Sequence, residues 1–172
     1  MTTQDDGGKS QAEAQLASVK VLAEWLAHTG NCEGEEDCTL LDETHGFTKA
    51  TAQIIADAFG IYPVTAVTAD NFTEYHEPDK ARERIEEDAL SVEVRTDWHA
   101  VGAEDDKPTE YNILLCTGGP AVRIIGRLTE YGEPETASIE YQDWFKPWTR
   151  LPIDGDDEDA LLAYASVFWF GE

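Results

Sequence analysis

The spacing of apolar residues along this chain changes near residue 90, and this change limits the folds that the chain can adopt. Before that point apolar residues recur every three or four positions, as on one side of a helix. After it they alternate with polar residues, as in strands with one buried face. Helices followed by strands favour an α+β fold, with helices packed on one face of an antiparallel sheet.

Three helices are expected in the first half of the chain. The first begins with the capping box Ser10–Glu13 and ends at Gly30, so residues 1–9 are expected to be a frayed tail. Thr48 is the expected cap of a second helix, which ends at Gly60. The third begins at a proline and has a polar, highly charged sequence. It covers residues 78–90, and its expected core residues are Ala81, Ile85 and Ala89. Between the last two helices, residues 61–77 leave room for one edge strand.

Four strands with short connections are expected to follow as an antiparallel meander, namely residues 91–98, 111–117, 121–128 and 136–142. In the first strand, one face is expected to be half-buried, and it carries Val92, Val94, Thr96 and Trp98. The second strand is apolar on both faces, which predicts a central position and a buried, reduced Cys116. A final helix is expected near the C-terminus, with Asp156 as its N-cap.

The formal charge of −24, from 36 acids against 12 bases, is the composition value that restricts function most. Affinity for nucleic acid comes largely from Lys and Arg, so direct DNA or RNA binding is not expected. A hydrophobic content of 41% is that of a packed chain, and we expect one domain over residues 1–172. The chain has no apolar run of membrane-spanning length, its first residues do not resemble a secretory signal, and it has three cysteines. These features predict a protein of the cytoplasm.

The acidity is concentrated in parts of the chain. Residues 31–45 hold six acids and no base, and residues 154–159 hold five acids and no base, whereas residues 111–150 hold five acids and four bases. Carboxylates one helical turn apart stand about 6 Å from each other, close to the ~7 Å between successive phosphates of a DNA strand. Such rows can imitate a nucleic-acid backbone. The candidate partner-binding residues are Glu33, Glu35, Glu36, Asp37, Asp42, Glu43, Glu104, Asp105, Asp106, Asp156, Asp157, Glu158 and Asp159.

The remaining candidate sites fit ordinary structural roles. The glycines of Thr117–Pro120 fit a hairpin turn better than a phosphate loop, because no helix follows them. A zinc site would need the four potential ligands His28, Cys32, Cys38 and His45, but their spacing matches no familiar zinc motif. No catalytic motif occurs, so neither an enzyme nor a cofactor is expected. The aromatic residues Tyr141, Trp144, Phe145 and Trp148 are expected mainly in the core, with an exposed interface as the alternative.

Three segments of the C-terminal half, EYNILLCTGGPAVRIIGRL, EYQDWFKPW and LLAYASVFWFGE, resemble a group of small uncharacterised proteins carried by phages, plasmids and integrative elements. The resemblance is one of pattern and brings no catalytic residues with it. It implies an accessory protein of a mobile element. Acidic proteins of that origin are similar in character to DNA-mimicking antirestriction and anti-CRISPR inhibitors.

These observations lead us to expect an inhibitor that occupies the nucleic-acid groove of a host defence nuclease, either a CRISPR-Cas effector or a restriction enzyme. The partner would be a basic nucleic-acid-binding protein, and a homodimer is a further option. Two alternatives stay open. One is a halophilic or regulatory interaction module, and the other is an enzyme without a recognisable motif.

Overall fold

The computed structural model describes residues 7–30, 56, 78–101 and 107–171. Contacts divide the chain into two compact units, the first made of residues 1–20 and 86–172 and the second of residues 21–85. The prediction of a single domain over residues 1–172 stays a prediction.

The described residues form an α+β fold, as expected. The helices are α1 (Gly7–Gly30), α4 (Pro78–Asp88) and α5 (Gly155–Ala165). The strands are β1 (Ser91–Arg95), β2 (Glu110–Cys116), β3 (Ala121–Arg127), β4 (Ser138–Gln142) and β5 (Thr149–Arg150). The four predicted strands are present, and the two-residue β5 makes the sheet five-stranded.

The sheet is an antiparallel meander in which each strand pairs with the next one along the chain, in the order β1-β2-β3-β4-β5. Ile113, Ile124 and Ile139 lie opposite one another on β2, β3 and β4, and all three are fully buried. This row forms the centre of the core of the first unit. Because β2 pairs on both sides, its predicted central position is confirmed.

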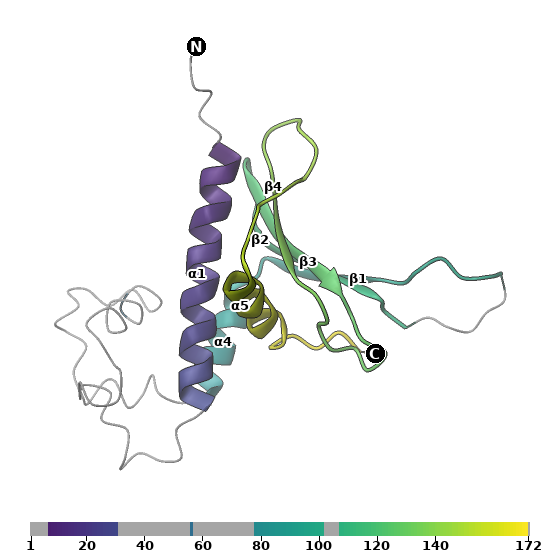
Figure 1. The fold of residues 1–172 in the computed structure, drawn as a ribbon, viewed down its shortest axis with the longest axis horizontal. Coiled ribbons are helices and arrows are strands. Elements are labelled where there is room, and N and C mark those ends of the chain that lie inside the picture. Colours follow the sequence, from purple (N-terminus) through teal and green to yellow (C-terminus); the bar gives the residue numbers. More distant parts are fainter. Residues whose placement is uncertain (1–6, 31–55, 57–77, 102–106, 172) are drawn as a thin grey trace. The chain divides into compact units, whose positions relative to one another are not determined.

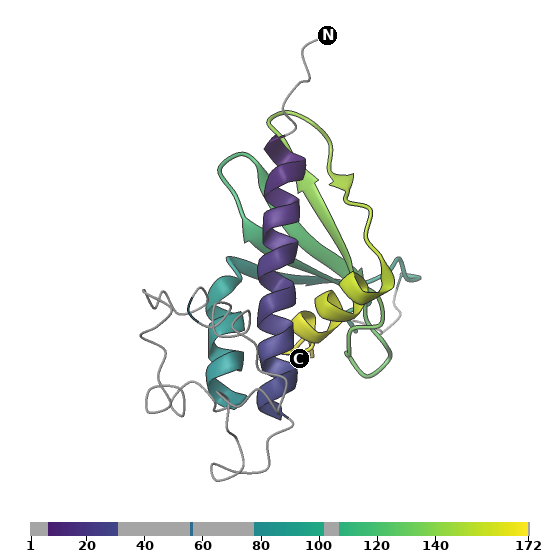
Figure 2. The same ribbon diagram turned by 60° about the vertical axis from the view of Figure 1, so that its left-hand side comes forward.

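Within the described residues, helices cover one face of the sheet. Burial alternates along β2, where Tyr111, Ile113 and Leu115 are buried and the residues between them are partly exposed. Figures 1 and 2 show α5 and the first part of α1 on the same side of the sheet. A Cβ added at Gly8 of α1 would stand 2.8 Å from the ring of Tyr141 on β4, so helix and sheet pack closely here. The opposite face of the sheet is largely polar.

Parts of α1 and α4 belong to the second unit and contribute buried apolar side chains to it. These are Leu22, Ala23 and Trp25 from α1 and Ala81 and Ile85 from α4. Ala81 and Ile85 are therefore confirmed as core residues, whereas the expected core residue Ala89 lies beyond the end of α4 and is only partly buried. Ala56 is helical and buried. It is the one described residue of the predicted helix over residues 48–60, and the edge strand considered over residues 61–77 lies outside the described residues.

Two predicted helix starts are wrong. Helix α1 begins at Gly7, so Ser10 lies inside the helix and residues 7–9 are helical. Helix α5 is capped by Asp154 instead of Asp156, because the extended backbone of Asp154 lets its carboxylate accept a hydrogen bond from the amide of Asp157. At α5 several acidic residues in a row could act as the cap, and the backbone conformation decides among them.

The predicted burial of β1 is also wrong. Val92 and Val94 project from the face of the sheet that is buried at β2, yet both are exposed, and Trp98 lies beyond the end of β1 and is fully exposed. Their alternation is that of a half-buried strand, but β1 stands at the edge of the sheet, where the core of the first unit does not cover it.

Cys116 is a free thiol, as expected, but it is half-buried. A β-bulge at the end of β2 shifts its register, and the partial burial raises the pKa of the thiol.

Within the described part of the chain, no helix combines the length and the apolar character that crossing a membrane requires.

Gly126 of β3 has no space for a side chain, which leads to a stability prediction. A Cβ at this position would lie 1.8 Å from the carbonyl oxygen of Thr136 and within 2.7 Å of two side-chain atoms of Tyr111. Gly126→Ala is expected to lower the free energy of unfolding by about 1–3 kcal/mol, as overpacking of a core does. The matched control is Gly155→Ala at the start of α5, where a Cβ meets nothing within 4 Å. Urea denaturation measures both variants, and equal midpoints would contradict the prediction.

Candidate partner-binding surface

Four of the thirteen predicted partner-binding acids lie within the described residues, and all four belong to the first turns of α5. These are Asp156, Asp157, Glu158 and Asp159. The other nine, at positions 33–43 and 104–106, lie outside the described residues, as do the side chains of the four potential zinc ligands. The described residues include no group of three or more His, Cys, Asp or Glu side chains arranged to hold a metal ion.

The first turn of α5 is held by two acidic side chains that bond to each other's backbone. Asp154 Oδ1 accepts a hydrogen bond from the amide of Asp157 at 2.9 Å, and Asp157 Oδ2 accepts one from the amide of Asp154 at 3.3 Å. This reciprocal capping box satisfies two amides that a helix start leaves unpaired. Negative charge is also favoured there, because the N-terminus of a helix carries a partial positive charge.

Asp157 also binds α1 of the same unit. Lys20 Nζ lies 2.5 Å from Asp157 Oδ1, and this pair joins α1 to α5 through two residues that are 137 positions apart in the sequence. The hydrogen bond from Lys20 is the main reason why the pKa of Asp157 is lowered, and the same bond raises the pKa of Lys20. Asp157 is one of the predicted partner-binding residues, and in the structure its carboxylate already contacts Lys20 and the amide of Asp154.

The remaining acids of this cluster differ in their availability. Glu158 is half-buried, and its Oε1 accepts a hydrogen bond from the amide of Ala137 at 3.4 Å. Asp154, Asp156 and Asp159 are exposed. The start of α5 therefore presents three carboxylates to solvent, of which Asp154 also caps the helix, beside two half-buried ones that make contacts within the chain.

Helix α4 presents a second set of exposed carboxylates, of which the last two are adjacent and the others are three or four residues apart. They are Asp79, Glu83, Glu86 and Glu87. Basic residues are interspersed among them, and Lys80 pairs with Glu83 at 3.0 Å. Asp88 at the end of the helix accepts a hydrogen bond from the hydroxyl of Tyr164 at 3.0 Å and is partly buried. The carboxylates of α4 thus form a row along a helix, but one partly neutralised by neighbouring bases.

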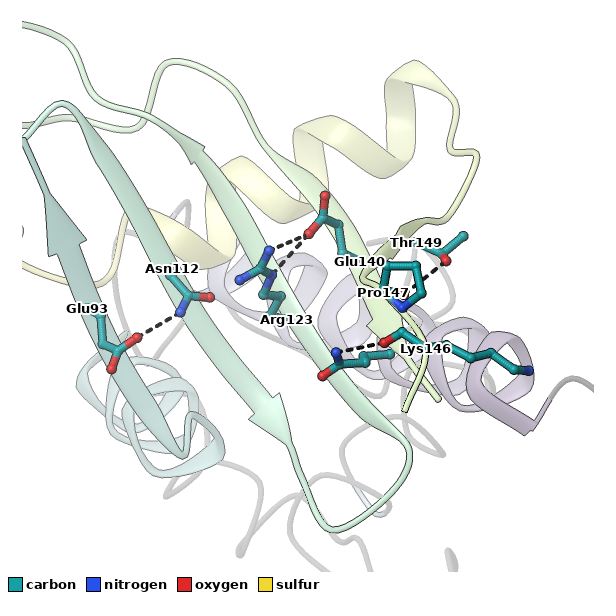
Figure 3. A network of polar contacts seen from close by, with 8 residues as sticks. Glu93, Asn112, Arg123, Glu140, Lys146, Pro147 and Thr149 are labelled. Carbon is teal, nitrogen blue, oxygen red and sulfur yellow. Dashed lines mark hydrogen bonds and ion pairs between the residues drawn. The ribbon is translucent and has the colours of Figure 1, made fainter. Parts of the chain in front are cut away.

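The uncovered face of the sheet has a different charge pattern, in which opposite charges pair across strands (Figure 3). Arg123 donates from Nε and Nη2 to one carboxylate oxygen of Glu140, at 3.0 and 2.7 Å. Its guanidinium also lies 4.1 Å from the centre of the Trp148 ring, a cation–π distance. On the neighbouring strands, Asn112 Nδ2 donates to Glu93 at 2.9 Å. These contacts are the cross-strand pairs that stabilise an exposed sheet face.

A shallow hollow of about 540 Å³ lies over this face. Its lining includes four of the six arginines of the sequence and three glutamates, namely Arg95, Arg123, Arg127, Arg150, Glu93, Glu110 and Glu158. Asn112 Oδ1 is buried at this site and accepts no hydrogen bond from the described residues. Charge is nearly balanced in the hollow, so this face is not part of the acidic surface.

The turn between β4 and β5 presents two aromatic side chains to solvent. Asp143 holds the turn, because its carbonyl accepts from the amide of Lys146 at 3.0 Å and its carboxylate pairs with Lys146 Nζ at 2.9 Å. Phe145 has a positive φ of 60° and is fully exposed, and Trp144 is 62% exposed. The expectation that these two rings belong to the core is therefore wrong. Tyr141 and Trp148, the other two members of the aromatic set, are half-buried.

Gly119 lies against the turn that carries Trp144 and Phe145, called the aromatic turn below. A Cβ on Gly119 would stand 2.0 Å from the Trp144 ring, and the backbone of Gly119 has a positive φ of 84°. Both facts require glycine in the β2–β3 turn, which confirms the prediction of a hairpin turn there and places that turn against Trp144. The contact is between the β2–β3 turn and the β4–β5 turn, and no local pattern in the sequence indicates it.

No family model, curated protein or solved structure matches this chain.

The capping box of α5 leads to a second stability prediction. Asp154→Ala is expected to lower the free energy of unfolding by about 1 kcal/mol, because the amide of Asp157 loses its acceptor. Asp156→Ala is the matched control, since it removes an exposed carboxylate from the same turn but no hydrogen bond to the backbone. Urea denaturation at neutral pH compares the two. A larger loss for the control would show that charge at the helix start matters more than the cap.

The pair between Lys20 and Asp157 predicts a dependence on pH. A carboxyl group with a lowered pKa contributes stability above its ordinary pKa and loses it as the pH falls through the lowered value. The difference in free energy of unfolding between wild type and Lys20→Met should therefore be present at neutral pH and shrink in acid. It should also shrink at high pH, as the pH rises through the raised pKa of Lys20. Because Lys20 is well exposed, the difference is small. A constant difference across the pH range would contradict the assignment.

Proposed function

We propose that this protein inhibits a host defence nuclease, a CRISPR-Cas effector or a restriction enzyme, by binding in its nucleic-acid groove as a mimic of DNA. The observation that carries the proposal is the uneven placement of acidic residues in a chain with a net charge of −24. Exposed carboxylates follow one another along α4 and at the start of α5, while the uncovered face of the sheet is nearly neutral. A basic groove would meet the acidic segments and not the sheet.

The physical basis is competition for the Lys and Arg side chains that bind phosphates. Carboxylates about one helical turn apart can occupy several such side chains at once. Long-range attraction between an acidic protein and a basic groove speeds association, and salt weakens it. Each exposed charge pair contributes only about 0.2–1 kcal/mol, so inhibition would depend on many carboxylates together.

Adaptation to high salt and binding through exposed aromatic residues are the alternatives to mimicry, and each predicts a different behaviour. An adaptation to high salt would make stability, and not binding, depend on the carboxylates. An aromatic contact is favoured by the turn that carries Trp144 and Phe145, since aromatic residues often supply most of the binding energy at protein interfaces. The nearly neutral sheet face argues against a uniformly acidic, salt-adapted surface.

The test is a DNA-cleavage assay in which a purified nuclease is titrated with variants of this protein. Three acids of the segment without bases are neutralised in the variant Glu33→Gln, Glu35→Gln, Glu36→Gln. The control variant loses the same number of negative charges from the connection between β3 and β4, which lies in the nearly neutral part of the chain. It carries Glu130→Gln, Glu133→Gln and Glu135→Gln at three exposed positions. We expect the first variant to inhibit several-fold less at low salt, the control to inhibit almost as wild type, and the difference to shrink as salt rises.

Equal inhibition by both triple variants would contradict mimicry by the acidic segment. A third variant, Trp144→Ala, separates the aromatic contact from mimicry. If it abolishes inhibition while neutralisation has no effect, the binding energy lies in the aromatic turn. Asp157 is left unchanged in all variants because its substitution would weaken the fold.

A further inference from the structure

Exposed apolar side chains are concentrated in one short part of the chain. Of the nine large hydrophobic residues that are exposed among the described residues, five lie between positions 90 and 101. They are Leu90, Val92, Val94, Trp98 and Val101. This segment consists of the edge strand β1 and its continuation. Such a concentration on one strand is typical of an interaction site.

No strand in the described part of the chain pairs with the outer edge of β1. Strand β1 is the first strand of the sheet, and among the described residues it pairs only with β2. Natural edge strands are commonly protected by proline, by a bulge or by a covering element. Strand β1 contains no proline, its pairing with β2 is regular, and its apolar residues are exposed. Its free backbone amides and carbonyls can therefore accept a further strand.

The two sides of β1 differ in chemistry. Val92 and Val94 lie opposite Ile113 and Tyr111 and so share the apolar side of the sheet. Glu93 and Arg95 lie on the other side, with opposite charges two positions apart. Any strand that adds to this edge must offer apolar residues on one side and complementary charges on the other.

The sequence of β1 meets that requirement itself. We propose that β1 pairs antiparallel with β1 of a second copy, about a twofold axis at Val94. In this register Val94 lies opposite its own counterpart, and Leu90 lies opposite the partner copy's Trp98. Each Glu93 lies opposite the Arg95 of the other copy, which gives two symmetric ion pairs. A register centred on Glu93 or on Arg95 would instead place like charges opposite each other, which destabilises a strand pair.

The side chains involved remain accessible for this pairing. Arg95 is 77% exposed although it already pairs with Glu110 of β2, and Glu93 accepts one hydrogen bond from Asn112. Two copies that each carry a charge of −24 repel at long range. Salt screens this repulsion, so dimerisation should strengthen as salt rises, whereas the proposed binding to a nuclease should weaken. The dimer does not depend on the proposed inhibitory function.

Charge-swapped variants of the full chain test the register. Glu93→Arg and Arg95→Glu each place like charges opposite each other in a homodimer, so each variant alone should dimerise about tenfold less tightly than wild type. In a mixture of the two variants, one copy carries two cations on this side of β1 and the other carries two anions. The mixture should therefore form a heterodimer with an affinity close to that of the wild-type homodimer. Sedimentation velocity over a range of protein and salt concentrations measures all four samples. Circular dichroism of each variant checks that the fold is retained.

Two results would overturn the proposal. One is a wild-type protein that sediments as a monomer at every salt and protein concentration. The other is dimerisation that neither single variant weakens or that mixing does not restore, which would place the contact elsewhere, for example at the aromatic turn. A matched variant, Glu133→Arg in the connection between β3 and β4, should leave dimerisation unchanged and so controls for the change in net charge.

Discussion

The structure of the first unit depends on the burial of one face of the meander. Tyr111, Ile113, Val122, Ile124 and Ile139 are removed from water on that side, and at about 25 cal/mol for each Å² of buried apolar surface they supply much of the stabilising free energy. A sheet with one covered face leaves its other face to polar residues. The cross-strand pair of Arg123 and Glu140 and the cation–π contact with Trp148 follow from this arrangement.

The excess of acids also affects how the few bases are used. Only 12 basic residues are present against 36 acids, and several have defined contacts. Lys20 joins α1 to α5, Lys146 closes the aromatic turn, and Arg123 links β3 to β4. Carboxylates, by contrast, are numerous enough that some serve the fold and others remain exposed. This division separates Asp157, which holds α5 in place, from Asp156 and Asp159, which face solvent.

The sequence predicted those features that depend on local patterns. Helix α4 begins at Pro78 as expected, and the strand-like patterns of residues 111–117 and 121–128 correctly indicated β2, β3 and the glycine turn between them. The failures concern long-range packing. Alternation predicts which residues share a side of β1, but whether that side is covered depends on helices distant in sequence. The packing of Trp144 against Gly119 likewise joins two turns that are far apart in the sequence. For the candidate surface, composition indicated acidity, but only the capping geometry shows which acids of α5 are already engaged.

The contact between α1 and the far end of the chain has a consequence for biosynthesis. The first part of α1 packs against Tyr141 of β4 and pairs with Asp157 of α5, so the partners of this helix are translated long after it, Asp157 137 positions after Lys20. Contacts of such high sequence separation form late and slow the folding of a domain. On the ribosome, α1 therefore emerges well before the surface that buries it, and its apolar side is open to chaperones or to other nascent chains until the sheet is complete.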